Sequence, residues 1–468
     1  MNKTLLMKFF LFFLLLPVLL IAQTNDNTIR VVGDSLVGRN INGKIIREVY
    51  NHVVITQGDV VITCDKAIQY ISDNNVELIG NVIIKQDSIT IETSRGFYFG
   101  DDKKTSTDEP LKLYDGEMTL SANMGKYSFD NHNAFFKNNV RLTDSSTTLT
   151  SDSLSYFKDS KRMIAMGNVK IVDSTNTIYS DSLNYFKTNK NTIADLNVKL
   201  ISKTDNTIVF GGHLENYPSR NYTIVSNNPL LMQIDTTVQK ANGNKFGQTK
   251  IDTLLISGKY LEAYRDSLDM YKVRDSVKIL RGDFASVNYK TLYYRKDKTL
   301  IITLNKKTNE QPVMWYENTQ ITGDSINIKI KDNKIDLMFV NKNVFVISQN
   351  EDYKNRFDQT SGDSLNSYFE DGKLIKTNIY GDVLSIYYQY DNGKKNGLSK
   401  SSSKLTTIYF DNNMAQEIRL YGTPNTEFYP ERLVEGKEDD FALPKYVPFK
   451  KRPIKSDLLK KTNFKKNN

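Results

Sequence analysis

The side chains that could support metal or acid–base chemistry are few in this chain of 468 residues, and they do not gather in the sequence. His52, His132 and His213 are its only histidines, and none has a second ligand at the spacing of a metal site. Each is therefore predicted to have a structural role. No Ser/His/Asp order, phosphate-binding loop or dinucleotide fingerprint is present. We predict a protein that is not an enzyme and that has no metal or other cofactor.

A second set of possible ligands consists of aspartates that recur in similar sequence contexts. They are Asp65, Asp152, Asp181, Asp324 and Asp363. A calcium site needs six to eight oxygen ligands, and one carboxylate per repeat falls well short of that number. The pattern therefore favours a role in bends or turns over a ladder of calcium ions.

Tyrosines form a third recurrent set, with Tyr98, Tyr127, Tyr156 and Tyr185 spaced 29 residues apart. Such a column could bind sugars by stacking. Packing against cross-strand neighbours in a half-buried sheet is the favoured interpretation.

The same spacing of 29 residues runs through the apolar positions, so the chain is predicted to be a repeat protein. The clearest column is Val53, Val82, Leu111, Val140, Val169 and Val198. A fixed period of this size indicates one supersecondary unit that is copied along the chain and buried by its neighbours. Function is therefore expected along an extended surface and not at a single point.

Each repeat contains two extended segments joined by short turns such as Asp144-Ser145 and Asp173-Ser174. Short hairpin turns require antiparallel pairing. Gly-Asn pairs, as in Gly80-Asn81 and Gly167-Asn168, interrupt one segment, and an aspartate such as Asp152 interrupts the other. Residues of these types favour bends and bulges within strands. We predict an all-β fold, a meander of antiparallel strands folded over into an elongated jelly roll, or two consecutive rolls.

The marker residue of each repeat, the residue two further on and the residue nine further on are predicted to share the inner face, because side chains in a strand alternate with a period of two. These positions are the candidate lipid-groove residues. They are Val53, Ile55, Ile62, Val82, Ile84, Ile91, Leu111, Leu113, Leu120, Val140, Leu142, Leu149, Val169, Ile171, Ile178, Val198 and Leu200. Either they fill a packed core, or the two sheets splay and admit acyl chains.

The chain is predicted to divide into four parts. Residues 1–22 read as a secretory signal peptide, with an uncleaved anchor as the alternative. Residues 23–235 hold the regular repeats, and residues 236–430 hold a second, degenerate β region. Residues 431–468 form a basic tail that is predicted to be disordered. The single cysteine, Cys64, excludes an intramolecular disulfide.

The net charge of +9 belongs mainly to the tail, because residues 445–468 carry nine Lys or Arg and one Asp. Such a tail favours a solubilising role or contact with anionic lipid head groups. Nucleic acid is not an expected partner, because no recognition module is visible and the chain is predicted to be secreted.

The Gly-Asn-Val-x-Ile units at residues 80–84 and 167–171, together with residues 58–70, resemble the OstA-like, LptA-like family of periplasmic lipopolysaccharide-transport proteins, especially its Bacteroidetes-type branch. The resemblance implies a twisted β-jelly roll that associates end to end in the periplasm. It also implies a passive bridge that shields lipid A acyl chains between inner-membrane and outer-membrane transport proteins. No single residue is carried over as a ligand.

Other function classes stay open at this point. A secreted structural or adhesive β-repeat protein would show the same period with a filled core. An outer-membrane-associated assembly factor would share the secretion signal and the β-rich composition.

Overall fold

The computed structural model describes residues 28–41, 43–204, 206–238, 249–411 and 414–459, and it consists almost entirely of antiparallel strands. The predicted signal peptide lies outside these residues. The all-β meander predicted from the sequence is confirmed. The chain forms two compact units that divide after Ala134, and each is described separately below.

The first unit, up to Ala134, is a stack of hairpins with one short 3-10 helix. Its elements are β1 (Arg30–Val32), β2 (Ser35–Ile41), β3 (Lys44–Gln57), β4 (Val60–Tyr70), η1 (Ile71–Asp73), β5 (Asn75–Gln86), β6 (Ile89–Phe99), β7 (Lys104–Thr107), β8 (Leu111–Tyr114), β9 (Thr119–Ala122) and β10 (Met124–Ser128). The long strands β3 to β6 pair with their sequence neighbours. β7 and β8 both pair with β6, as two halves of one interrupted strand.

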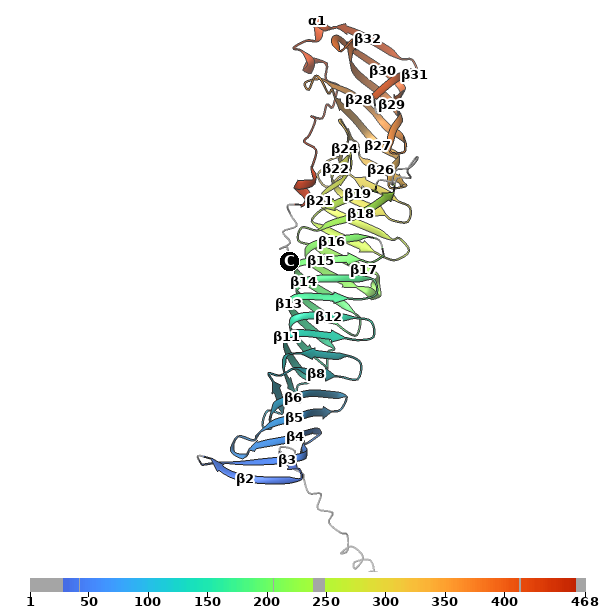
Figure 1. Ribbon diagram of the computed structural model, residues 1–468. Helices are drawn as coiled ribbons and strands as arrows, with labels where there is room; N and C mark the ends of the chain where they lie inside the picture. The colour runs from blue at the N-terminus through green and yellow to red at the C-terminus, as the bar shows by residue number, and fades with distance from the viewer. Residues whose placement is uncertain (1–27, 42, 205, 239–248, 412–413, 460–468) are drawn as a thin grey trace, which may run out of the picture. The chain divides into compact units, whose positions relative to one another are not determined.

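The second unit starts within β11 and is itself a stack of antiparallel strands (Figure 1). Its strands are β11 (Asn133–Thr143), β12 (Thr148–Phe157), β13 (Arg162–Val172), β14 (Asn176–Phe186), β15 (Asn191–Ser202), β16 (Thr207–Tyr217), β17 (Tyr222–Ser226), β18 (Leu230–Val238), β19 (Thr249–Ser257), β20 (Tyr260–Tyr264), β21 (Met270–Arg281), β22 (Phe284–Tyr294), β23 (Thr299–Thr303), β24 (Val313–Tyr316), β25 (Thr319–Thr322), β26 (Ser325–Lys331), β27 (Lys334–Gln349), β28 (Phe357–Glu370), β29 (Lys373–Asp391), β30 (Lys394–Asp411), β31 (Met414–Tyr421) and β32 (Asn425–Pro430). Its helices are η2 (Pro218–Arg220), α1 (Glu431–Val434), η3 (Glu438–Phe441) and α2 (Lys455–Leu459).

A bulge bends the long strands at the positions where the sequence predicts a break. In β13, Gly167 and Asn168 have φ angles of +77° and +45° and together lie opposite the single residue Asp181 of β14. Glycine and asparagine adopt this left-handed conformation more easily than other residues. The Asn168 side-chain amide donates a 2.9 Å hydrogen bond to Asp152 of β12.

The same aspartate–asparagine hydrogen bond recurs in other repeats. It joins Asn81 to Asp65 at 2.9 Å and Asn197 to Asp181 at 2.6 Å. The recurrent aspartates therefore stabilise bulges, as the bend interpretation predicts. Among the residues that the structure describes, no group of three or more His, Cys, Asp or Glu side chains is placed to hold a metal ion.

Because of the bulges, each long strand contributes to two facing walls. The first wall contains the strand halves next to turns such as residues 187–190, which form the first rim. The second wall contains the halves next to turns such as residues 173–175, which form the second rim. Buried side chains alternate along both halves, as in Met163 and Ala165 of the first wall and Val169 and Ile171 of the second. These residues define the inner face.

The hairpin of β18 and β19 spans residue 236, near which the sequence predicts a boundary between the regular repeats and the degenerate β region. The two strands pair in register from Leu230 opposite Ser257 to Val238 opposite Thr249. Paired strands therefore continue across this position, and the second unit holds the last of the regular repeats together with the degenerate β region. The change in sequence regularity reflects looser repeats and not the end of the sheet.

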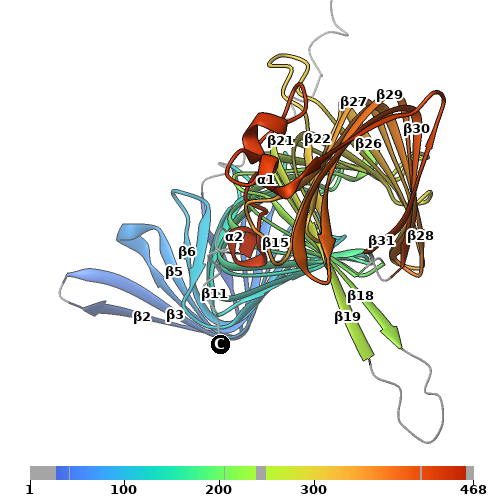
Figure 2. The same ribbon diagram turned by 90° about the horizontal axis from the view of Figure 1, so that it is seen from above.

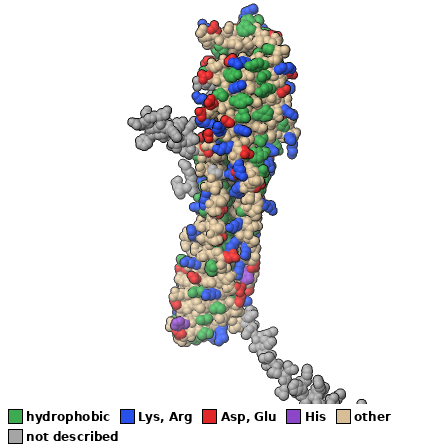
Figure 3. Space-filling model, turned by 90° about the vertical axis from the view of Figure 1, so that its right-hand side faces the viewer, with side chains coloured by type: hydrophobic (Ala, Val, Ile, Leu, Met, Phe, Trp, Pro, Cys, Tyr) green, Lys and Arg blue, Asp and Glu red, His purple; other side chains and the backbone are tan. Residues whose placement is uncertain are grey.

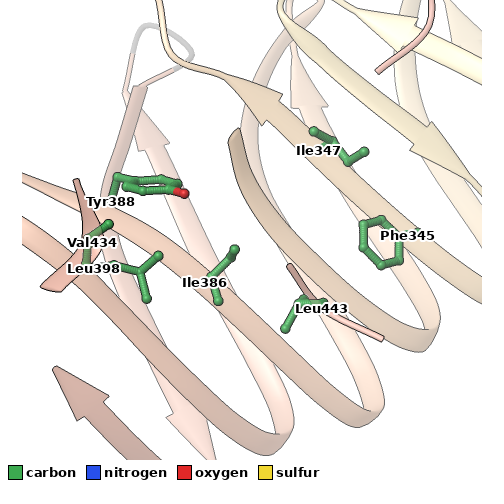
Figure 4. Packing of buried hydrophobic residues seen from close by; sticks show 7 residues of the cluster. All are labelled: Phe345, Ile347, Ile386, Tyr388, Leu398, Val434 and Leu443. Carbon is green, nitrogen blue, oxygen red and sulfur yellow. The ribbon is translucent and has the colours of Figure 1, made fainter. Parts of the chain in front are cut away.

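The last described segment, residues 431–459, is called the C-terminal strap, and it differs from the disordered tail that we predicted. Val434, Leu443 and Leu458 are each at most 2% exposed. Val434 and Leu443 pack with Ile386 and Leu398 (Figure 4). Leu458, in α2, packs against Leu230 and Leu255 of β18 and β19. The tail residues 460–468 lie outside the described part of the chain.

The strap covers the outer face of the second wall. On β29 the side chain of Val383 points to the inner face. Side chains alternate along a strand, so Ile386 and Tyr388, which contact the strap, point to the outer face. Figure 2 agrees, because α1 lies outside the curve of β27 to β30. The side chain of Gln320, also on the outer face, accepts a 2.7 Å hydrogen bond from the Lys450 amide and donates one of 3.2 Å to the Pro448 carbonyl.

Candidate functional site

The predicted groove residues form continuous ladders on the inner face. All seventeen are buried, with at most 7% of the surface exposed. In the first unit, Ile55 lies opposite Ile62, Ile62 opposite Ile84, and Ile84 opposite Ile91. Leu113 and Leu120 continue this row. The 29-residue period therefore places equivalent side chains side by side across successive strands.

A second ladder runs along the inner face of the second unit. Leu149 lies opposite Ile171, Ile171 opposite Ile178, and Ile178 opposite Leu200. Leu200 then lies opposite Val209. The row continues through Leu231, Ile256 and Ile279, beyond the last of the regular repeats. One uninterrupted apolar row thus lines the second wall of this unit.

The two walls make contact across the mouth of the trough. In the first unit, the Gln57 side chain at the end of β3 donates a 3.0 Å hydrogen bond to the Gly100 carbonyl and accepts one of 2.6 Å from the Tyr98 hydroxyl. In the second unit, the Lys190 ammonium on the first rim donates a 3.0 Å hydrogen bond to the Ser146 hydroxyl on the second rim. These contacts are polar and close the mouth locally.

A cavity of about 350 Å³ lies between the walls of the second unit. Three of the predicted groove residues, Ile171, Ile178 and Leu200, line its second wall. Val225 and Leu261 line the first wall. The other predicted groove residues do not line it. The structure thus brings only part of the predicted set to an open space, and the rest pack against one another.

Polar side chains separate this apolar floor from the rims. On most strands that line the cavity, the inner-face residue nearest the turn is polar and the one two positions deeper is apolar, as in Asn176 and Ile178 or Thr223 and Val225. We call the polar set the girdle. It comprises Thr147, Asn176, Thr192, Ser202, Asn216 and Thr223. Sequence reasoning missed the girdle, although Thr147 and Asn176 lie two positions before Leu149 and Ile178 of the predicted set.

Cations from the first rim line the cavity above the girdle. They are Lys190, Arg265 and Arg295, and Asp173 lies on the second rim. The Arg265 guanidinium donates a 2.8 Å hydrogen bond to the Asn216 side chain and also contacts the Thr223 hydroxyl. Arg295 forms an ion pair with Asp269 and lies 4.9 Å from the centre of the Tyr271 ring. The girdle therefore holds Arg265 in place at the mouth.

The tyrosine column packs inside the roll. Tyr98, Tyr127, Tyr156 and Tyr185 are all at most 3% exposed. The Tyr127 ring lies edge-on to Phe129, with 4.9 Å between ring centres. Burial raises the pKa of Tyr185, which lines the cavity. This geometry fits the packing interpretation of the column, because rings buried on the inner face are not presented to a polysaccharide on the outside.

None of the three histidines lines the cavity. His213 lies at a bulge, where its ring nitrogens are 2.6 Å from Asp195 and 3.0 Å from Glu215. Burial alone would lower the pKa of His213, but the hydrogen bonds to the two carboxylates outweigh it and raise the pKa. His52 is exposed and lies 2.8 Å from Asp34.

Apolar side chains also gather on the outside of the last strands, interleaved with Lys and Arg (Figure 3). Tyr368, Met414 and Tyr421 are among the exposed ones, at 37%, 65% and 44%. Within the described residues, no helix is long and apolar enough to cross a membrane.

A comparison with protein-family models agrees with the resemblance seen in the sequence. The family model described as OstA-like protein matches residues 33–181 and 134–210. Among solved structures, the chain is similar to LptH, described as the LptA homologous periplasmic component of the lipopolysaccharide transport device of Pseudomonas aeruginosa. That similarity has 9% identity and a TM-score of 0.18, and covers 35% of this chain and 86% of the other. Comparison with curated proteins gives no match. Residues 33–210 are therefore similar to the OstA-like family.

Proposed function

We propose that this protein is a periplasmic lipopolysaccharide-binding transport protein that shields lipid A acyl chains in its trough during transfer to the outer membrane. The observation that carries the proposal is the uninterrupted inner ladder of the second unit, which opens into a cavity at Ile171, Ile178 and Leu200. The match of residues 33–210 to the OstA-like family model supports it.

The proposed mechanism is passive. Moving an acyl chain from water to an apolar surface gains about 0.8 kcal/mol per methylene group, so ten buried methylenes gain about 8 kcal/mol. That gain is large compared with the polar contacts that close the mouth, each worth about 1 kcal/mol. An entering acyl chain can therefore displace a contact such as Lys190 to Ser146. The work of extraction from the inner membrane belongs to a separate partner.

The expected partners are lipopolysaccharide and the inner-membrane and outer-membrane proteins of its transport. Pairing of one copy with another, end to end, belongs to the same proposal. β2 offers an edge for such pairing, with Leu36, Val37 and Ile41 at 56%, 42% and 51% exposure. Edge strands present backbone groups that can pair with another strand.

The alternative of a secreted structural or adhesive repeat has one observation in its favour. The first unit is closed at Gln57 and Tyr98 and packs Leu113, Leu120 and Phe129 with no exposed surface. A filled core of this kind needs no ligand.

Depletion of the protein in its own cells tests the transport function. We expect newly made lipopolysaccharide to be retained in the inner-membrane fraction within a few generations, because the passive bridge between the membranes is lost. Membrane fractions separated on a density gradient and analysed for lipopolysaccharide measure this. An unchanged distribution in cells that lack the protein would favour the structural repeat.

A further inference from the structure

The cavity of the second unit changes in chemistry from its mouth to its floor. Inner-face residues nearest the turns form the polar girdle, and those two positions deeper are apolar. Girdle residues such as Thr192, Asn216 and Thr223 are only 4–7% exposed. Burying polar side chains is costly unless they form hydrogen bonds, so a polar ring in an otherwise apolar trough needs an explanation.

Part of that explanation lies within the protein. The Thr223 hydroxyl donates a 2.7 Å hydrogen bond to the Asn216 side chain, and the Asn176 amide donates one of 2.8 Å to the Thr175 hydroxyl. The girdle still surrounds a space of about 350 Å³, with an apolar floor on one side and charged rims on the other. That sequence of surfaces matches an amphiphile, whose polar linkages lie between its apolar chains and its charged head.

The first rim supplies positive charge beside this space. Its five turns, at residues 158–161, 187–190, 218–221, 265–269 and 295–298, contain nine Lys or Arg and four Asp. Backbone hydrogen bonds join neighbouring turns, such as the Lys187 amide to the Lys161 carbonyl at 2.9 Å and the Arg265 amide to the Asn221 carbonyl at 2.8 Å. The rim is therefore an ordered extension of the sheet.

We propose that this cavity is a site for the head-group end of a phosphorylated amphiphile, with a phosphate at Arg265 and Arg295, polar linkages at the girdle and acyl chains on the floor at Ile178 and Leu200. This rests on the proposed function and assigns the orientation of the lipid in the trough. Arginine donates to phosphate through two parallel N–H groups, and the girdle contacts hold Arg265 in advance. In the proposed complex, Arg295 keeps its ion pair with Asp269 and also contacts the phosphate.

The test uses the purified full chain and measures its binding to three probes, namely lipid A with its phosphates, enzymatically dephosphorylated lipid A, and inorganic phosphate. We expect the double variant Arg265→Gln/Arg295→Gln to bind phosphorylated lipid A at least about tenfold more weakly, as expected for lost charge-assisted hydrogen bonds. Its binding to dephosphorylated lipid A should stay unchanged.

Two further variants act as controls. Arg220→Gln removes a cation from the same rim that does not line the cavity and instead stacks on Tyr217, so binding should not change. Ile178→Gln alters the floor and should weaken both forms of lipid A equally. Thermal unfolding followed by circular dichroism confirms that each variant is folded.

Several outcomes overturn the proposal. An equal loss for the two forms of lipid A in the double variant contradicts a phosphate contact, and so does no loss at all. Competition by inorganic phosphate at the lipid's own concentration indicates a simple anion site. If the unaltered protein binds neither form of lipid A, both the proposed function and the proposed site are wrong.

Discussion

Replacing Glu431 and Glu438 by Gln is expected to detach the C-terminal strap and to lower the free energy of unfolding of the second unit by about 3–5 kcal/mol. The Arg356 side chain is fully buried and forms ion pairs with both glutamates. Its guanidinium also lies 4.9 Å from the centre of the Tyr388 ring. Arginine keeps its charge in proteins, so the double variant leaves a buried cation without a compensating charge.

The fluorescence of Trp315 can show whether the strap has detached. Trp315 is the only tryptophan of the chain, it is 1% exposed, and it packs near Phe449 of the strap. Release of the strap should shift its fluorescence emission to longer wavelength at low denaturant concentration, before the sheet unfolds. Urea titration followed at Trp315 and by circular dichroism measures both effects.

The matched control is Glu435→Gln. Glu435 follows α1, and its side chain is 66% exposed where it pairs with Lys395 at 3.3 Å. Exposed ion pairs contribute about 0–1 kcal/mol, so this variant should behave like the unaltered protein. If the double variant matches the control in both stability and emission, the strap is not held by the Arg356 cluster.

The second large effect is expected for Gly167→Ala, which should destabilise the second unit by about 2–3 kcal/mol. Gly167 has a φ angle of +77°, a conformation that costs an alanine about 1 kcal/mol. A Cβ atom there would also lie 2.3 Å from the Asp152 carboxylate and 2.9 Å from its Cβ. Asp152 must then move, which breaks its hydrogen bond with Asn168, a loss of about 1–1.5 kcal/mol.

Gly393→Ala separates the two contributions. Gly393 has a similar φ angle of +73°, but a Cβ atom there would meet no other atom within 4 Å. This variant should lose only about 1 kcal/mol. Denaturant unfolding of both variants gives the comparison, and equal losses at the two positions would show that the bulge tolerates a side chain.

The sequence predicted the repeated part of the fold well because two short-range rules act together there. Alternation with a period of two places Val169 and Ile171 on one face, and the Gly167-Asn168 pair interrupts the strand without ending it. The 29-residue period then aligns each unit with the next. These rules depend on a few neighbouring residues, so they can be read without the tertiary structure.

The strap could not be predicted in the same way. Its many lysines and prolines and few apolar residues are typical of disorder, and that consideration decided the prediction for residues 431–468. The missing information lay far away in the sequence, on β27 and β29. There Phe345 and Ile386 make the outer face apolar as well as the inner face. A strand with apolar residues at both odd and even positions indicates a sheet that is covered on both faces. This pattern could have predicted that a segment packs on the outer face.

The cavity was predicted only in part. The inner position of Ile171, Ile178 and Leu200 followed from the period, but nothing in the period distinguishes a ladder that is packed tightly from one that borders a space. That difference depends on the distance between the walls, which small shifts of many residues determine. Arg265 and Arg295 lie on turns of the less regular repeats. The 29-residue spacing does not extend to these turns, so it could not identify the two arginines.

The most direct test of the central claim is photocrosslinking in living cells at Ile178, which lines the cavity, with the exposed position Lys170 as the control. The photoreactive residue at position 178 is predicted to give an adduct that carries lipopolysaccharide, and the one at position 170 is not. A folded protein that gives no adduct at position 178, or equal adducts at both positions, would contradict a lipid-binding trough.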